Sequence, residues 1–134
     1  VDNNTDKFCF SYFQNQILNN IKLNKLLINS GEINKNINSC LKIWNKLSDL
    51  SCDRNSVLIN LGGGVITDIG GFIASTFKRG IDFINVPTTL LSQVDAAIGG
   101  KTGVNSTEGK NLIGSLLLIF SETTSFSSLR AFAP

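Results

Sequence analysis

The sequence predicts an α/β fold of the Rossmann-like, doubly wound type, with a parallel sheet covered by helices. One observation is a continuous aliphatic run at 56–61 that leads directly into Gly62, Gly63 and Gly64. The others are a helical pattern over 65–77 and a second aliphatic run at 81–86. A strand, a crossover helix and a second strand form the repeating unit of such a sheet. At 134 residues, of which 42% are hydrophobic, we expect one partial domain over 1–134.

The first 30 residues contain one predicted strand. Residues 1–24 are polar with scattered apolar positions, and this pattern does not separate strand from helix. The run 25–29 is predicted as a short buried strand of the parallel sheet, because it is mostly apolar and stops at Ser30 and Gly31.

An amphipathic helix is predicted over 36–50. Apolar residues recur there at three- and four-residue spacing, which is typical of a helix packed on a sheet. Its expected inner face carries Ile37, Leu41, Trp44 and Leu47. We expect the Trp44 ring in the core rather than stacked on a ligand.

A strand, a helix and a second strand are predicted over 56–61, 65–77 and 81–86. The strand at 56–61 is aliphatic on both sides, as in a parallel sheet covered on both faces. The helix at 65–77 contains Gly70 and Gly71, each of which costs about 1 kcal/mol relative to alanine in a helix. Close packing of helix against sheet is the favoured reason for keeping them. We expect Gly80 to terminate this helix as its C′ glycine, and Pro87 to stop the strand at 81–86.

Composition excludes several classes of function. A net charge of +2 gives no basis for binding nucleic acid or an anionic membrane, and no apolar run is long enough to span a bilayer. The absence of histidine excludes a histidine-based triad or a histidine-ligated metal within this chain. Cys9, Cys40 and Cys52 lack metal or redox spacing and are expected to be free thiols in the cytoplasm. No signal peptide is visible, and the chain begins without methionine, so we expect residues before Val1.

The glycine run favours a nucleotide diphosphate site. Gly63 and Gly64 have no Cβ to obstruct a ligand, and the N-terminus of the following helix attracts phosphate. The run is not the usual dinucleotide fingerprint, because Thr67 stands where the last glycine should be. The GKT at 100–102 is not a P-loop either, because that frame requires glycine where Asp95 stands.

Other polar residues near the strand ends are candidates for ligand contact. Asp68 could bind a ligand or orient the glycine turn, and the Thr88–Thr89 pair could line a site or cap a helix. Lys101 and Lys110 lie with Asp95, Asn105 and Asn111 in or beside a glycine-rich polar segment, 99–111, which we expect to be a loop. This combination suits a polyhydroxylated, phosphorylated anion better than a set of isolated surface charges.

These motifs together resemble 3-dehydroquinate synthase. The resemblance rests on GGGVITDIGGF, RGIDFINVPTTLLSQVDAAIGGKTGVN and GKNLIG over residues 56–115, and on GEINK at 31–35 with the helix that follows. It implies a family-like core at 25–119 and a divergent tail at 120–134. It also implies cyclisation of 3-deoxy-D-arabino-heptulosonate 7-phosphate to 3-dehydroquinate in the shikimate pathway, with phosphate release, NAD as transient oxidant and zinc or cobalt.

The resemblance also implies roles for individual residues. Asp95, Lys101 and Asn111 match positions that contact the substrate, with Lys101 stabilising charge near the reacting carbonyl. The expected cofactor-binding residues are Glu32 and Lys35 at the adenosine end, the turn through Gly63, Gly64, Val65, Ile66, Thr67 and Asp68, and Thr88, Thr89, Lys101 and Lys110.

Some of the family pattern is missing from this sequence. The family's metal ligands are one Glu and two His on a second domain, so we expect no metal ligands here and no activity from this chain alone. The tail after Phe120 departs from the pattern and suggests a truncated or frameshifted reading of the gene. The complete enzyme is expected to be a homodimer. Three alternatives stay open: a related sugar-phosphate cyclase, a metal-dependent alcohol or glycerol dehydrogenase, and a non-catalytic NAD-binding remnant.

Overall fold

The computed structural model describes residues 1–17, 21 and 23–116. The predicted departure of the tail after Phe120 therefore lies outside the described residues. In the described part, no helix is both long and apolar enough to cross a membrane. The elements are α1 (Asn3–Thr5), η1 (Asp6–Phe10), α2 (Ser11–Ile17), η2 (Glu32–Asn34), α3 (Ile37–Asp49), β1 (Val57–Gly62), α4 (Gly64–Thr76), η3 (Phe77–Arg79), β2 (Asp82–Pro87), η4 (Ser92–Ala96), β3 (Lys101–Ser106) and β4 (Gly109–Leu116).

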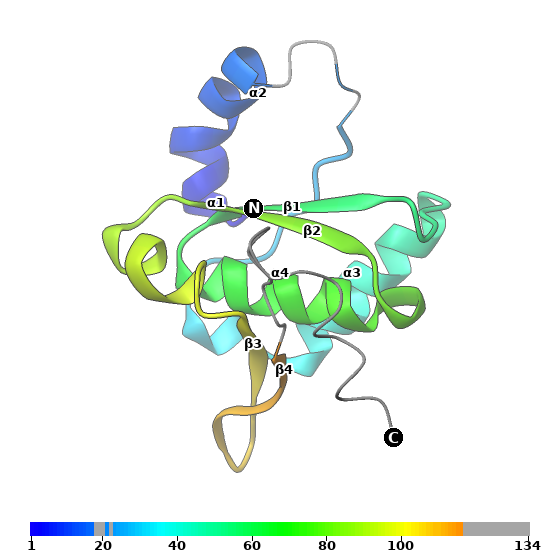
Figure 1. The fold of residues 1–134 in the computed structure, drawn as a ribbon, viewed down its shortest axis with the longest axis vertical. Coiled ribbons are helices and arrows are strands. Elements are labelled where there is room, and N and C mark those ends of the chain that lie inside the picture. The colour runs from blue at the N-terminus through cyan, green and yellow to red at the C-terminus, as the bar shows by residue number, and fades with distance from the viewer. Residues whose placement is uncertain (18–20, 22, 117–134) are drawn as a thin grey trace, which may run out of the picture.

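A parallel β1–α4–β2 unit forms the centre of the fold. β1 and β2 pair in parallel from Val57 with Asp82 to Gly62 with Pro87, and α4 connects them. Figure 1 shows α4 lying along one face of this sheet. The predicted strands at 56–61 and 81–86 and the α/β class are confirmed, with each strand shifted by one residue.

The two faces of the sheet bury different side chains. Leu58 and Phe83 are opposite each other in the register and pack against the core that contains Ile69 and Ile73 of α4. The other face buries Leu61 against Phe13 of α2. The sheet therefore has helical cover on both sides, as its doubly aliphatic strands predict.

Helix α3 confirms the predicted helix but presents a different face to the core. Its buried residues are Cys40, Ile43 and Leu47, whereas Ile37 and Leu41 are 39% and 48% exposed. The predicted inner face is therefore right for Leu47 and wrong for Ile37 and Leu41, because packing against α4 buries Cys40 and Ile43 instead. The prediction for Trp44 is confirmed: its ring packs on the core, and Nε1 donates to the Ile73 carbonyl at 3.3 Å.

The predicted strand at 25–29 is wrong. Ile28 forms only an isolated parallel bridge with Asp2, and its N–H donates to the Val1 carbonyl at 3.0 Å. A short apolar run becomes a strand only when a sheet edge lies within reach. Residues 3–17, which the pattern left unassigned, are helical and supply Phe13 to the core.

The end of α4 also differs from the prediction. The C-cap is Phe77, and the residues that follow it, Lys78 and Arg79, have left-handed φ angles of 49° and 71°. Gly80, with φ 117°, comes two residues later than a C′ glycine would. Its N–H donates to the Phe77 carbonyl at 2.9 Å, so the glycine closes the short η3 turn instead.

The segment 99–111 is not the loop that its composition suggested. It contributes to an antiparallel hairpin, in which β3 pairs with β4 and the register shifts between Val104 and Ser106. Gly103 and Gly114 oppose each other where β3 and β4 approach, and a Cβ on Gly114 would overlap the Thr102 carbonyl oxygen. The glycines that made this stretch look irregular therefore permit the close pairing.

Candidate functional site

The glycine turn lies at the carboxyl edge of the parallel sheet. β1 ends in Gly62, which pairs with Pro87 at the end of β2, and the Thr88 N–H donates to the Gly62 carbonyl at 2.9 Å. Gly63 is the N-cap of α4 and offers no capping side chain, so the first N–H groups of this helix receive no side-chain cap. Such a helix N-terminus favours an anion.

The threonine pair adjoins this turn. A Cβ on Gly63 would lie 3.3 Å from Cγ2 of Thr89, so the two motifs are neighbours in space. Thr89 also begins the helical segment that contains η4: its Oγ1 accepts from the Ser92 N–H at 3.3 Å, and its own N–H donates to Ser92 Oγ at 3.3 Å. The helix-capping interpretation of Thr89 is therefore confirmed, and a role in lining a site stays a prediction.

A polar cavity of about 470 Å³ lies next to the turn. Four of the predicted site residues line it: Asp68 from α4, Asp95 from η4, Lys101 from β3 and Asn111 from β4. A Cβ on Gly64 would lie 3.6 Å from that of Ala96, another residue of the cavity wall, so η4 connects the cavity with the glycine turn. Residues from four elements thus meet at one place.

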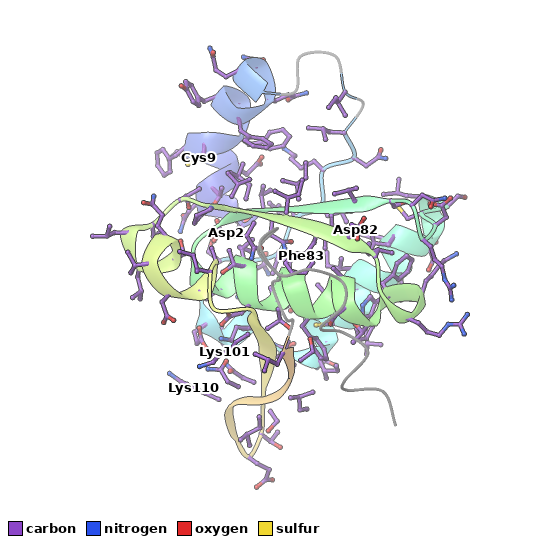
Figure 2. All side chains as sticks on the ribbon, viewed as in Figure 1. Asp2, Cys9, Asp82, Phe83, Lys101 and Lys110 are labelled. Atoms are coloured by element: carbon purple, nitrogen blue, oxygen red, sulfur yellow. The ribbon has the colours of Figure 1, made fainter. Side chains whose placement is uncertain are left out.

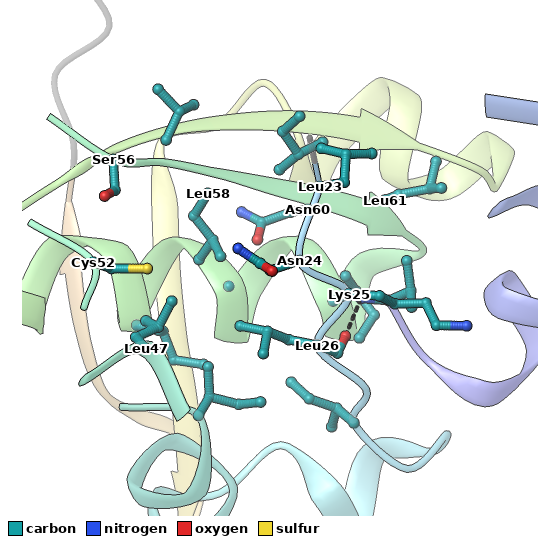
Figure 3. Close-up of a pocket in the computed structure, with 18 of the residues that line it drawn as sticks. Leu23, Asn24, Lys25, Leu26, Leu47, Cys52, Ser56, Leu58, Asn60 and Leu61 are labelled. Atoms are coloured by element: carbon teal, nitrogen blue, oxygen red, sulfur yellow. Dashed lines mark hydrogen bonds between the residues drawn. The ribbon is translucent and has the colours of Figure 1, made fainter. Parts of the chain in front are cut away.

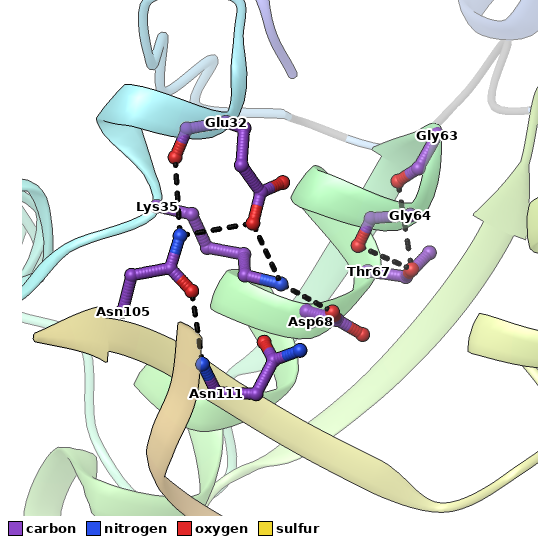
Figure 4. Close-up of polar contacts among 8 residues, drawn as sticks. All are labelled: Glu32, Lys35, Gly63, Gly64, Thr67, Asp68, Asn105 and Asn111. Carbon is purple, nitrogen blue, oxygen red and sulfur yellow. Dashed lines mark hydrogen bonds and ion pairs between the residues drawn. The ribbon is translucent and has the colours of Figure 1, made fainter. Parts of the chain in front are cut away.

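The predicted ligand-binding residue Lys35 is enclosed within the protein. Its side chain is 4% exposed, and Nζ forms ion pairs with Asp68 Oδ2 at 2.8 Å and with Glu32 Oε1 at 3.4 Å (Figure 4). Glu32 remains partly exposed. Lys35 therefore joins the segment 31–36 to α4 and would act on a ligand through Glu32 and Asp68.

The two carboxylates that Lys35 joins have opposite pKa shifts. Burial raises the pKa of Asp68 above 3.8 despite the opposing effect of Lys35. Its contribution to stability therefore falls as the pH rises through the window above 3.8. For Glu32, partial burial would raise the pKa, but hydrogen bonding from Asn105 and the charges of Lys35 and Lys110 outweigh it and lower the pKa below 4.5.

Glu32→Gln is expected to make the protein less sensitive to acid. A lowered folded-state pKa stabilises the parent fully above pH 4.5, and this stabilisation is lost as the pH falls through the folded value. Glutamine does not titrate, so urea unfolding measured from about pH 6 to about pH 3 should show a shallower decline for the variant. Glu108→Gln removes an exposed carboxylate between β3 and β4 and controls for the loss of one charge. Identical slopes for the parent and Glu32→Gln would contradict this.

Four other predicted residues fall into two groups. Ile66 and Thr67 are buried, and their N–H groups donate to the Gly63 carbonyl at 3.0 and 3.1 Å, so they shape the turn from inside. Lys101 and Lys110 are exposed on the hairpin (Figure 2). Lys101 lines the polar cavity, whereas the charge of Lys110 acts on Glu32.

A second cavity of about 320 Å³ is mainly apolar (Figure 3). It lies between the segment 23–28, β1 and α4, and of the predicted site residues only Ile66 lines it. Among its described lining residues, the one charged side chain, that of Lys25, is ion-paired with Asp6 at 2.8 Å.

The described residues bring together no group of three Cys, Asp or Glu side chains that could hold a metal ion. Burial also raises the pKa of Cys40 to about 12, so this thiol stays protonated and is a poor ligand. Metal chemistry is not assigned to this part of the chain.

The parallel β-α-β unit, with the glycine turn and the polar cavity at the carboxyl edge of its sheet, defines an α/β protein of the class whose ligands bind at that edge. The chain belongs to the family described as 3-dehydroquinate synthase N-terminal, whose model matches residues 25–131. This match extends beyond residue 119, where the family-like core was predicted to end.

Proteins with similar sequences are named 3-dehydroquinate synthase. A 3-dehydroquinate synthase of Campylobacter hominis is 59% identical over 102 residues, which is 74% of this chain and 30% of that protein. One from Parabacteroides distasonis is 50% identical over 115 residues, covering 86% of this chain and 32% of that protein. The chain thus spans about a third of the length of these relatives.

Solved structures with a similar fold include two synthases with NAD+ bound. A 2-deoxy-scyllo-inosose synthase complexed with carbaglucose-6-phosphate, NAD+ and Co2+ superposes with a TM-score of 0.80 at 28% identity, over 86% of this chain and 32% of that one. A 2-epi-5-epi-valiolone synthase from Streptomyces hygroscopicus with NAD+ and Zn2+ bound gives a TM-score of 0.75 at 29% identity, over the same shares.

Proposed function

We propose that this chain is the NAD-binding part of a 3-dehydroquinate synthase. The complete enzyme would convert 3-deoxy-D-arabino-heptulosonate 7-phosphate to 3-dehydroquinate and release phosphate. The observation that carries the proposal is the convergence of Asp68, Asp95, Lys101 and Asn111 on one polar cavity beside the open N-terminus of α4. Membership of the 3-dehydroquinate synthase family supports the type of reaction proposed.

The glycine turn fits the pyrophosphate of NAD. Gly63 and Gly64 carry no Cβ that would obstruct a ligand at the turn, and the N-terminus of α4 would compensate the negative charge. Val65, Ile66 and Thr67 would contribute by shaping this turn. Glu32 is exposed enough to contact the adenosine end, while Lys35 would hold Glu32 and Asp68 in place. Thr88, Thr89 and Lys110 would border the same region.

NAD, when bound, would supply an acceptor for the hydride of the carbon that bears one substrate hydroxyl. The chain's own residues would bind and orient the substrate at the polar cavity. The ammonium of Lys101, which lines the cavity, would stabilise negative charge on the substrate oxygen through a charge-assisted hydrogen bond. Asp95 and Asn111 would orient the substrate through hydrogen bonds, and their positions on η4 and β4 enclose it from two sides.

A zinc or cobalt ion belongs to the proposed activity, but its ligands are placed outside the residues described here. The described residues contain no group of three Cys, Asp or Glu side chains that could hold the ion. Homodimer formation and a cytoplasmic location are parts of the same proposal, and the free cysteines are compatible with a reducing compartment.

A 3-dehydroquinate synthase is favoured over the related sugar-phosphate cyclases and metal-dependent dehydrogenases. The relatives named 3-dehydroquinate synthase are 50–59% identical to this chain, whereas the inosose and valiolone synthases are 28–29% identical. A non-catalytic remnant would keep the fold and the NAD site but would not support phosphate release in any combination.

Fragment complementation tests the proposal. The chain alone is expected to bind NAD but to release no phosphate from the heptulosonate phosphate, even with zinc supplied, because a catalytic zinc site needs about three protein ligands. Adding the remainder of the Campylobacter hominis enzyme should produce release, and Lys101→Ala should lower it about a hundredfold. Absence of NAD binding, or NAD-dependent release by the chain alone, would contradict the proposal.

A further inference from the structure

Asn105 lies where the hairpin leaves its regular pairing. The register of β3 against β4 shifts between Val104 and Ser106, so Asn105 has no regular partner on β4. Its backbone bonds in the other direction: the N–H donates to the Lys35 carbonyl at 2.8 Å, and Asn105 forms an isolated parallel bridge with Asn36. The irregularity in β3 therefore attaches the hairpin to the segment that holds Glu32 and Lys35.

The Asn105 side chain makes the same connection a second time. Nδ2 donates to Glu32 Oε1 at 2.9 Å, and Oδ1 accepts from the Asn111 N–H at 3.0 Å (Figure 4). The orientation of the amide is fixed by its partners, because a backbone N–H can only donate and an ionised carboxylate can only accept. One side chain thus connects a carboxylate 73 positions away with a residue six positions away.

Asn111 has a left-handed backbone conformation. Its φ of 55° lies in a region that asparagine adopts more readily than most non-glycine residues, but one that differs from ordinary strand angles. The hydrogen bond from its N–H to Asn105 stabilises this conformation at the wall of the polar cavity. The loss of that bond would free the backbone of Asn111 to relax toward ordinary strand angles and move its amide relative to Lys101.

We propose that Asn105 is a positioning residue that fixes Asn111 at the polar cavity and Glu32 at the adenosine end of the site. Asn105 thereby keeps the polar cavity and the adenosine end in a constant position relative to each other. The cofactor and substrate assignments rest on the proposed function, whereas the linkage of Glu32, Asn105 and Asn111 does not. None of these effects requires Asn105 itself to touch a ligand.

Three variants separate the two ends of the Asn105 amide. Asn105→Ala removes the three side-chain hydrogen bonds, to Glu32 Oε1, to the Glu32 carbonyl and from the Asn111 N–H. Asn105→Asp keeps an acceptor for Asn111 but places a carboxylate against Glu32. In the double variant Glu32→Gln/Asn105→Asp, the glutamine amide can donate to the new carboxylate, so the contact is restored with its polarity reversed.

Hydrogen exchange at the Asn111 amide and NAD titration give the two measurements. We expect Asn105→Ala to accelerate that exchange about tenfold, and Asn105→Asp to leave it near the parent rate, since a hydrogen bond of about 1.4 kcal/mol corresponds to tenfold. NAD affinity should fall about tenfold in Asn105→Asp and return to that of the Glu32→Gln single variant in the double variant.

The outcomes identify which idea fails. Unchanged Asn111 exchange in Asn105→Ala would overturn the positioning role, and so would a double variant that binds NAD no better than Asn105→Asp. A parent chain that does not bind NAD would refute the proposed function instead, and the exchange measurement would still decide whether Asn105 holds Asn111.

Discussion

Replacing Gly63 by valine is expected to weaken NAD binding about a hundredfold, which corresponds to two lost hydrogen bonds to a charged group at about 1.5 kcal/mol each. Gly63 precedes α4 at the point where a pyrophosphate would meet the first N–H groups of the helix. A Cβ there already lies 3.3 Å from Cγ2 of Thr89, so the two methyl groups of valine would have to fill the ligand's space or displace Thr89.

Calorimetric titration with NAD measures this effect, and Gly109→Val is the matched control. A Cβ at Gly109 would also meet a flexible side chain at 3.3 Å, that of Leu112, but it lies at the hairpin turn. The control should bind NAD like the parent, and urea unfolding should show that both variants are folded. If Gly63→Val kept the affinity of the parent, the glycine turn would have a structural role only.

Gly70→Ala is expected to destabilise the fold by about 1–3 kcal/mol, the usual range for overpacking a core. A Cβ at this position would overlap the side-chain amide of Asn60 on β1. Asn60 is 4% exposed, and its Nδ2 donates to Asn85 Oδ1 at 3.0 Å across the sheet, so it cannot move without losing that bond. This cost should exceed the gain of about 1 kcal/mol that alanine brings to a helix interior.

The same substitution should have the opposite effect when Asn60 is alanine. Asn60→Ala removes the overlap, so Gly70→Ala in that background is expected to be neutral or to stabilise by up to about 1 kcal/mol. Urea unfolding of the parent, both single variants and the double variant gives the coupling energy of the cycle. Gly64→Ala in the same helix, where the nearest atom to the new Cβ would be 3.6 Å away, is the control. Equal costs in both backgrounds would exclude Asn60 as the obstacle.

The β-α-β unit was determined locally by the sequence. The aliphatic runs at 56–61 and 81–86 and the glycine turn between strand and helix each specify their element without a distant partner. The prediction that Gly70 permits close packing also follows from local rules, because a glycine inside a buried helix needs a steric reason. The tertiary structure supplied only the identity of the neighbour, Asn60.

Elsewhere the partners decided the structure. The run 25–29 is apolar enough for a strand but reaches only an isolated bridge to Asp2, while the polar segment 99–111, which looked like a loop, contributes to a hairpin. Burial of Lys35 and the linkage through Asn105 depend on residues 33 and 73 positions away. Periodicity encodes which local element is favourable, but ion pairs and side-chain hydrogen bonds between distant segments form only where the path of the whole chain brings the groups within about 3 Å.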